Sequence, residues 1–188
     1  MEYYQHTFTG SDPLPPTWAA SEFEECRFTG LTLTGADFRK SRFINCRFDD
    51  CLLSKAVLSG TQLATVLFRN CEMTHLNFGD SDAFGFAIRA ENCRMDHNTF
   101  LRRNLSKARF DECSLTSAHF IGCNLTDAVF SSCNLERAVF EENQLVRTDF
   151  ISSFHLRMDP DVNTFKKTRV SLYQLPGLLA KYDLSVSE

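Results

Sequence analysis

The eight cysteines of this 188-residue chain are the side chains with the widest possible chemistry. Thiols can form disulfides, bind zinc or act as nucleophiles, and each use requires its own spacing. No two of them stand in the Cys-x-x-Cys spacing of a zinc knuckle. Each stands two positions before an apolar residue, where other parts of the chain have alanine, so we expect reduced, buried thiols. They are Cys26, Cys46, Cys51, Cys71, Cys93, Cys113, Cys123 and Cys133.

The other polar residues form no catalytic or metal-binding motif. His75 and His97 fall at the same place in neighbouring repeats, but two ligands do not complete a zinc site. The sequence has no serine–histidine–aspartate arrangement, glycine-rich phosphate loop or paired-carboxylate motif. It therefore predicts a protein that is not an enzyme and has no metal or cofactor.

Apolar residues recur at every fifth position, and this period decides the fold class. From Phe23 to Phe78, and again from Met95 to Phe150, every fifth residue is phenylalanine, leucine or methionine. A helix would space them by three and four residues and a strand by two, so neither fits. One large and one small inward residue per unit predict a solenoid whose stacked coils bury a common core.

Units such as CRFDD, ADFRK, CNLTD and AVFEE match the pattern A/C-x-L/F-x-x, and with them the chain resembles the pentapeptide-repeat family. The resemblance implies an all-β fold, a right-handed quadrilateral β-helix with about twenty residues in each coil. When the apolar residues at every fifth position are grouped at intervals of one coil, one group is a column of phenylalanines. This aromatic ladder has Ile88 between its two halves. The ladder consists of Phe28, Phe48, Phe68, Phe110, Phe130 and Phe150.

The coil from Ser81 to Asn104 is the least regular part of the solenoid. Ile88 and Met95 are seven residues apart instead of five, which predicts a two-residue insertion bulging from the wall near 89–92. The insertion is either tolerated without a role or a loop that contacts a partner.

We expect one domain with three parts: an N-terminal cap segment at 1–21, the β-helix at 22–154, and a C-terminal cap and dimerisation segment at 155–188. Trp18 is expected to plug the first coil. No apolar run approaches the ~20 residues that span a bilayer, and the start MEYYQHTF lacks the features of a secretion signal, so we expect a cytoplasmic protein.

In the last part, Ser171 and Gln174 match a capping box at the start of a short α-helix, with Pro176 as its first residue. The apolar residues of this segment are expected to close the last coil and to join two chains in a homodimer. They are Leu175, Leu178, Leu179, Tyr182, Leu184 and Val186.

The net charge of −4 is unevenly spread along the sequence. Seven acidic side chains lie between positions 111 and 149, against only Arg137 and Arg147. We interpret them as an acidic patch that binds a basic partner. They are Asp111, Glu112, Asp127, Glu136, Glu141, Glu142 and Asp149.

The segment DSDAFGFAIRAENCRMDHNTF is similar to a stretch of the quinolone-resistance (Qnr) proteins, and the tail VNTFKKTRVSLYQLPGLLAKYDLSVSE resembles the ends of albicidin-resistance and microcin-immunity proteins. The resemblance implies a dimeric rod that imitates DNA, binds DNA gyrase or topoisomerase IV, and modulates it or confers quinolone or toxin resistance. Direct binding to nucleic acid or membrane is not expected. Qnr proteins have two long loops that project from the coils, whereas this chain continues through CRFDDCLLSKAVL without a loop and has only the two-residue insertion. This difference favours a similarity to the members without loops, which bind or inhibit gyrase. The alternative is a scaffold with an unrelated partner.

Overall fold

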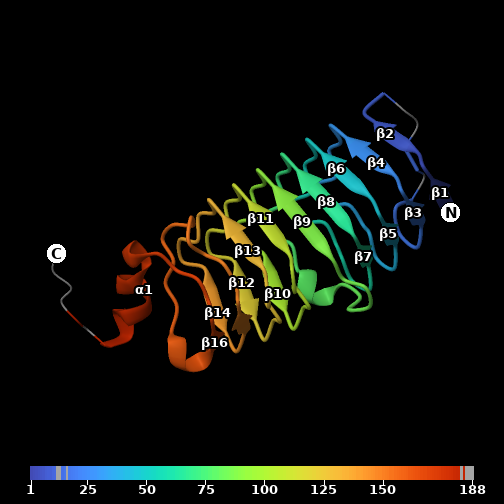
Figure 1. Cartoon of the computed structure of the whole chain (residues 1–188). Helices are drawn as coiled ribbons and strands as arrows, with labels where there is room; N and C mark the ends of the chain where they lie inside the picture. The colour runs from blue at the N-terminus through green and yellow to red at the C-terminus, as the bar shows by residue number, and fades with distance from the viewer. Residues whose placement is uncertain (12–13, 16, 183, 185–188) are drawn as a thin grey trace.

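The computed structural model describes residues 1–11, 14–15, 17–182 and 184. The chain winds as a right-handed, four-sided β-solenoid of about eight turns, with the N-terminus at one end of the rod and a short helix at the other (Figure 1). The predicted fold class is confirmed. Within the described residues, no helix is long and apolar enough to cross a membrane.

Four faces run along the rod, and we name them A to D in the order in which the chain visits them from β2 onward. Face A is a seven-stranded parallel sheet of β2 (Thr7–Thr9), β4 (Arg27–Thr29), β6 (Arg47–Asp49), β8 (Val66–Arg69), β9 (Ile88–Glu91), β11 (Arg109–Asp111) and β13 (Val129–Ser131). Face B has isolated parallel bridges that join Thr32, Leu52, Glu72, Arg94, Ser114, Asn134 and Phe154 in turn.

Face C begins with the bridge between Asp37 and Val57. It continues with the 3₁₀ turn η1 (Phe78–Asp80) and the strands β10 (Thr99–Leu101), β12 (His119–Ile121) and β14 (Val139–Glu141). Face D begins with β1 (Glu2–Tyr4), β3 (Glu22–Glu24), β5 (Arg42–Ile44) and β7 (Gln62–Ala64), and ends with β15 (Gln144–Val146) and β16 (Thr164–Lys166). Every strand pairs with the strand one coil away, so each column of side chains consists of residues separated by one coil.

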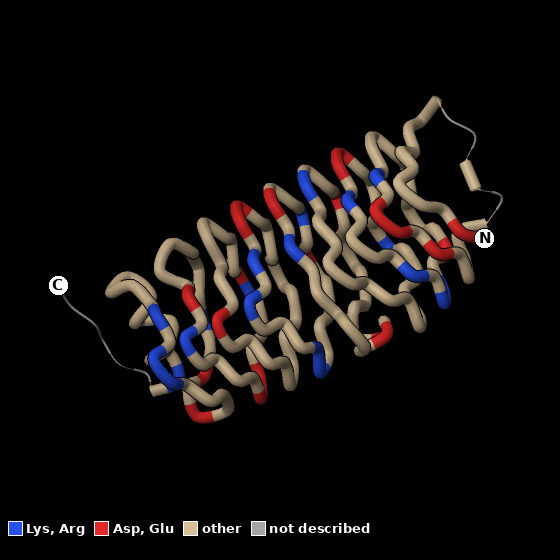
Figure 2. Tube along the Cα trace, turned by 45° about the vertical axis from the view of Figure 1, so that its right-hand side comes forward, with Lys and Arg blue, Asp and Glu red and all other residues tan. Residues whose placement is uncertain are grey.

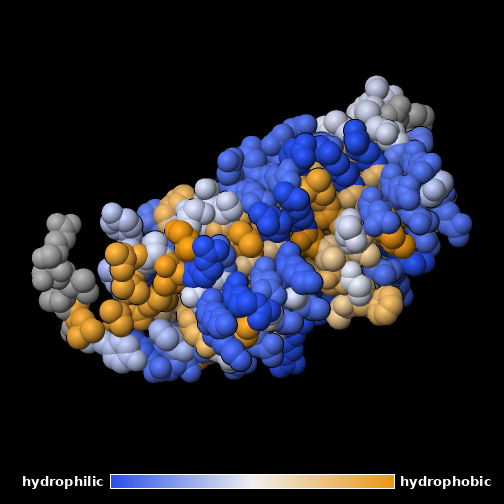
Figure 3. Space-filling model, viewed as in Figure 1, coloured by the Kyte–Doolittle hydropathy of each residue, from blue (hydrophilic) through white to orange (hydrophobic). Residues whose placement is uncertain are grey.

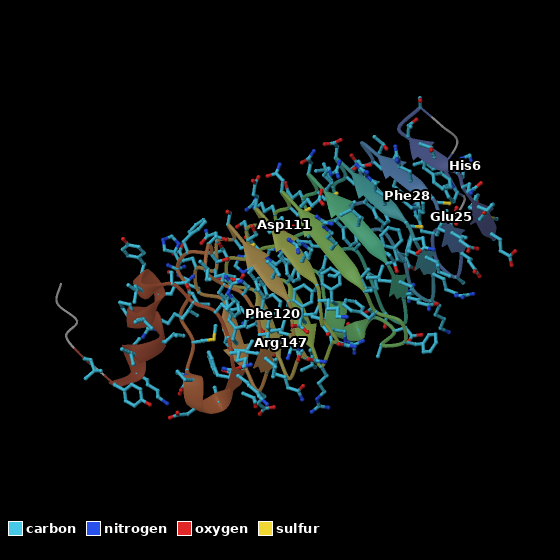
Figure 4. The ribbon with its side chains drawn as sticks, in the orientation of Figure 1. His6, Glu25, Phe28, Asp111, Phe120 and Arg147 are labelled. Carbon is cyan, nitrogen blue, oxygen red and sulfur yellow. The ribbon has the colours of Figure 1, made fainter. Side chains whose placement is uncertain are left out.

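The large inward residues stack ring on ring and form the core (Figure 4). On face A, the ring centroids of Phe28 and Phe48 are 4.4 Å apart and nearly parallel. On face C, the rings of Phe100 and Phe120 stack at 4.8 Å. Such pairs add about 0.5–1.5 kcal/mol each to the stabilisation from burial. The rings therefore hold successive coils in register.

The small inward position is often polar, because its side chain donates a hydrogen bond to a carbonyl one coil away. Thr61 Oγ1 donates to the Phe38 carbonyl at 2.6 Å, and Asn143 Nδ2 donates to the Phe120 carbonyl at 2.8 Å. The Cys46 thiol contacts the Phe23 carbonyl at 3.2 Å in the same way. The buried cysteines thus act as weak donors as well as small apolar groups.

The predicted site of the insertion, near 89–92, is wrong. Ile88 pairs with Val66 and Ala90 pairs with Phe68, so the register of face A is continuous through β9. Ala90 fills the large inward position and Ile88 the small one, which reverses the order of sizes that the period predicted. The two extra residues lie earlier, in the loop 82–87 between η1 and β9.

Local hydrogen bonds and a cation build the 82–87 loop. The Asp82 carboxylate accepts the Phe84 N–H at 2.9 Å, and the guanidinium of Arg103 donates to the Ser81 carbonyl at 3.0 Å. That guanidinium also lies over the Phe86 ring, 6.0 Å from its centroid. Phe86 is buried, whereas the Phe84 side chain is 78% exposed.

Coil pairing extends beyond the expected β-helix boundaries at both ends. Residues 2–4 of β1 pair with β3, and β16 pairs with β15, so regular pairing reaches from 2 to 166. Trp18 is partly buried against the core, and its ring lies 5.7–6.0 Å from four phenylalanines. The segment at 1–21 therefore contains the first coil as well as this plug.

The last coil is followed by η2 (Pro160–Val162), η3 (Leu172–Gln174), α1 (Leu175–Leu179) and η4 (Ala180–Tyr182). The Gln174 side chain accepts the Ser171 N–H at 2.8 Å and donates to the Phe150 and Ser153 carbonyls at 2.7 Å each. Pro176 lies in the first turn of α1.

The expected closure of the last coil by a stripe of large apolar residues is wrong in part. Of the stripe, Leu178 packs against the core, while Leu175 is 39% and Tyr182 51% exposed. Leu184 is also exposed, and Val186 lies outside the described residues. The buried amide of Gln174 covers the end of the coil, because it satisfies carbonyls that apolar side chains cannot.

Candidate partner-binding surface

The seven carboxylates of the expected acidic patch lie on all four faces. Asp111, Glu112 and Asp149 belong to face A, Glu136 to face B, Glu141 and Glu142 to face C, and Asp127 to face D. The chain passes over all four faces in each coil, so residues that are close in sequence lie on different faces. Acidic residues that are near one another in sequence therefore do not form one surface. Figure 2 accordingly shows acidic and basic positions interspersed along the solenoid.

Several of these carboxylates are paired with arginines one coil away. Arg147, labelled in Figure 4, donates two hydrogen bonds to Asp127, at 2.6 and 2.7 Å. These bonds lower the pKa of Asp127. Arg169 lies 2.7 Å from Asp149. Such exposed pairs are worth little stability, but they leave less negative potential for a partner.

Asp111 belongs to a longer ladder of charges on face A. Its carboxylate lies 3.5 Å from Arg89 and 3.7 Å from Arg109. Arg89 also pairs with Glu91 at 2.9 Å, and Glu91 pairs with Arg69 at 2.9 Å. Positive and negative groups alternate along this ladder, so the middle of face A has no strong net charge.

Among the seven, Glu112, Glu141 and Glu142 have no cationic partner within the part of the chain that the structure describes. Glu141 and Glu142 lie at the end of β14, beside a hollow of ≈ 380 Å³. Its wall also includes Arg157, Met158, Asp159 and Val162, although Arg157 forms no ion pair with either glutamate. Lys181 joins Asp159 at 2.5 Å and also contacts Asp161, which ties the C-terminal helix to this wall.

A second group of carboxylates, which the linear charge count missed, lies at the N-terminal end of face D. Glu2 stands in register with Glu22, and Glu24 and Glu25 follow in the same coil. Glu22 pairs with Arg42 at 2.7 Å. The signal in the sequence is the interval of one coil between Glu2 and Glu22, the same interval that separates the stacked phenylalanines.

Face B carries a polar network centred on Asp96. The Ser114 hydroxyl donates to one carboxylate oxygen at 2.5 Å, the Thr116 N–H donates to the same oxygen at 3.1 Å, and Arg94 Nε donates to the other at 2.9 Å. Burial opposes ionisation, but the Ser114, Arg94 and Thr116 bonds outweigh it and lower the pKa of Asp96.

We expect Asp96→Asn to cost about 1–3 kcal/mol of unfolding free energy at neutral pH, because the Ser114, Thr116 and Arg94 donors lose a charged acceptor that is itself buried. The pKa of Asp96 is lower in the folded protein than in the unfolded chain, so its ionised carboxylate stabilises the fold. This stabilisation is complete above the unfolded pKa of ~3.9 and is lost as the pH falls through the lower folded pKa. Urea unfolding from pH 7 to pH 2.5 should show the variant and the parent converging at the acid end. Glu141→Gln, at an exposed unpaired carboxylate, is the control. A difference that stays constant with pH would contradict this assignment.

The two histidines that the sequence places at equivalent positions of neighbouring repeats are close together, and their rings are stacked. The His75 and His97 rings lie 4.8 Å apart at the corner of face B. Within the described residues, no three His, Cys, Asp or Glu side chains converge as metal ligands.

The C-terminal end of the rod exposes apolar side chains, which gather over the helix at the left of Figure 3. Leu172 is 82% and Tyr173 97% exposed. Beside them is a hollow of ≈ 550 Å³, whose wall includes Ile151, Phe154 and Leu156. Monomeric proteins seldom leave so many large apolar groups together in water.

Two models of one protein family match most of the chain. The model described as "pentapeptide repeat region" matches residues 21–100, and the model described as "pentapeptide repeats (8 copies)" matches residues 103–131 and 123–153. The chain is a pentapeptide-repeat protein. No curated protein sequence matches it at a significant level.

Solved structures similar to this pentapeptide-repeat protein include QnrB1, a plasmid-mediated fluoroquinolone resistance protein. A trypsin-treated form of QnrB1 is 16% identical with a TM-score of 0.57, and the match covers 100% of this chain and 92% of that one. Full-length QnrB1 is also 16% identical, with a TM-score of 0.51 and coverage of 98% and 100%. This pentapeptide-repeat protein therefore shares the fold of QnrB1 along its whole length.

Proposed function

We propose that this pentapeptide-repeat protein binds a type II topoisomerase, DNA gyrase or topoisomerase IV, and modulates it or confers quinolone or toxin resistance without catalysing a reaction. The observation that carries the proposal is the end-to-end similarity to QnrB1, a fluoroquinolone resistance protein. The partner would be met in the cytoplasm, where chromosomal DNA is handled.

The rod would act by occupying the site for DNA. A duplex carries one negative charge per ~1.7 Å, far more than this chain presents, so the imitation rests on shape and on local carboxylates. Glu112, Glu141 and Glu142 suit this role, because no arginine forms an ion pair with them in the described structure. The paired Asp111, Asp127, Glu136 and Asp149 would contribute less.

A second copy of the chain would cover the exposed C-terminal surface. Leu172, Tyr173 and Tyr182 lie there beside the ≈ 550 Å³ hollow. In a symmetric dimer through this end, the later coils of both chains flank the two-fold axis. The unpaired glutamates of both chains would then lie in the central half of one long rod.

A gyrase supercoiling assay across protein concentration, with and without a fluoroquinolone, tests the proposal. Wild-type protein should inhibit gyrase or relieve drug inhibition, and Glu112→Lys/Glu141→Lys/Glu142→Lys should weaken either effect at least ~10-fold, or about 1.4 kcal/mol. Glu2→Lys/Glu24→Lys/Glu25→Lys changes the net charge equally at the other end and is the control. Absence of inhibition, protection and binding by the wild type would leave the scaffold alternative.

A further inference from the structure

Five of the eight thiols form one continuous column inside the solenoid, behind face B. The bridges that join Leu52, Glu72, Arg94, Ser114 and Asn134 place the residue before each of them in consecutive coils. All five side chains are at most 2% exposed. The column consists of Cys51, Cys71, Cys93, Cys113 and Cys133.

The cysteines of this thiol column repeat at the spacing of the coils. Cys51 and Cys71 each contact a carbonyl one coil away at 3.5 Å and a carbonyl of their own coil at 3.2 Å. Cys93 Sγ in turn accepts the N–H of Cys71 at 3.5 Å. Because the five cysteines occupy the same position in successive coils, their backbones repeat at about the ~4.8 Å between paired strands.

That separation is wrong for a disulfide, which needs Cβ atoms ~3.5–4.5 Å apart and sulfurs ~2.05 Å apart. It also gives no tetrahedral zinc site, because no three ligands converge in the described structure. A metal ion bound by two thiolates in a straight line, with two bonds of ~2.3 Å, holds the sulfurs ~4.6 Å apart. This distance is close to the spacing of the coils. A linear bis-thiolate fits between neighbouring coils almost without movement of the backbone.

We propose that the thiol column binds soft, divalent, two-coordinate metal ions, of which the mercuric ion is the type, between cysteines of neighbouring coils. Two S–H bonds break, two S–Hg bonds form, and two protons leave for the solvent. The bound group is neutral, which suits an apolar interior. A monovalent soft ion would leave a buried negative charge and is disfavoured.

The protonation of the column makes binding dependent on pH. Because the metal must displace thiol protons, affinity should rise with pH over the range in which the protein stays folded. Burial also means that the metal enters slowly, through transient opening of the coils.

A pair of matched variants tests the proposal, in a Cys26→Ala/Cys46→Ala background that removes the other adjacent pair of thiols. Cys71→Ala/Cys113→Ala leaves thiols two coils apart, whereas Cys51→Ala/Cys133→Ala removes as many thiols but leaves three in adjacent coils. Alanine already fills equivalent inward positions such as Ala118, so both should fold.

Each variant is incubated with mercuric chloride, and the bound metal is counted by native mass spectrometry while circular dichroism reports the fold. The adjacent-thiol variant should bind about one more mercuric ion per chain than the separated-thiol variant, and release about two more protons. Equal metal content in the two variants, or binding only with loss of the β-sheet signal, would overturn the proposal.

Discussion

Phe120→Ala is expected to lower the free energy of unfolding by about 3–5 kcal/mol. The Phe120 side chain is fully buried, and its ring stacks on Phe100 at 4.8 Å and on Phe140 at 4.9 Å. It also meets Phe110 and Phe130 edge to face. Alanine would leave a cavity that the backbone cannot close, because the coils on both sides are fixed by their hydrogen bonds.

Urea denaturation followed by circular dichroism measures the change for Phe120→Ala. Phe84→Ala is the matched control, since it removes the same atoms from a ring that is 78% exposed on the 82–87 loop. The control should stay within about 0.5 kcal/mol of the parent. Equal stability of the two variants would mean that the stacked rings do not carry the core.

Gly177→Ala is expected to displace the C-terminal helix from the end of the solenoid. A Cβ at this position would lie 1.9 Å from the Leu156 carbonyl oxygen and 3.3 Å from Arg157 Cα, so the backbone of this segment leaves it no room. Overpacking of this kind costs about 1–3 kcal/mol. The helix would take with it the two hydrogen bonds from Gln174 to the last coil.

Hydrogen exchange of the segment 150–182 should therefore accelerate in Gly177→Ala, while exchange in the central strands should change little. Gly10→Ala is the control, because a Cβ at Gly10 meets no atom within 4 Å. Unchanged exchange at the C-terminal end of Gly177→Ala would show that the helix does not depend on this close contact.

The sequence predicts the solenoid well, because one rule of spacing determines both the inward residues and the coil length. It places the phenylalanine ladder, the buried cysteines and the neighbouring histidines without knowledge of the backbone. The five-residue spacing fails where a small residue fills the large inward position and a large residue fills the small one. Ile88 is larger than Ala90, yet the loop 82–87 shifts the frame, and only the pairing with Val66 and Phe68 reveals this.

The charge pattern of the surface is harder to predict than the core, because each charged side chain can be paired with an opposite charge one coil away. Asp127 and Arg147 are separated by a full coil in sequence but share two hydrogen bonds. Likewise, the capping match of Ser171 with Gln174 finds the helix, yet the inward role of the Gln174 amide follows only from the carbonyls that it meets.

The amide of Gln174 has a consequence for the size of the assembly. A solenoid with open carbonyls at its tip offers a template on which another molecule could continue the winding, and such growth leads to fibres. Here the carbonyls of Phe150 and Ser153 are already occupied by Gln174 of the same chain. Winding cannot continue through these two carbonyls, so contact between chains at this tip would end in a closed pair and not in a growing fibre.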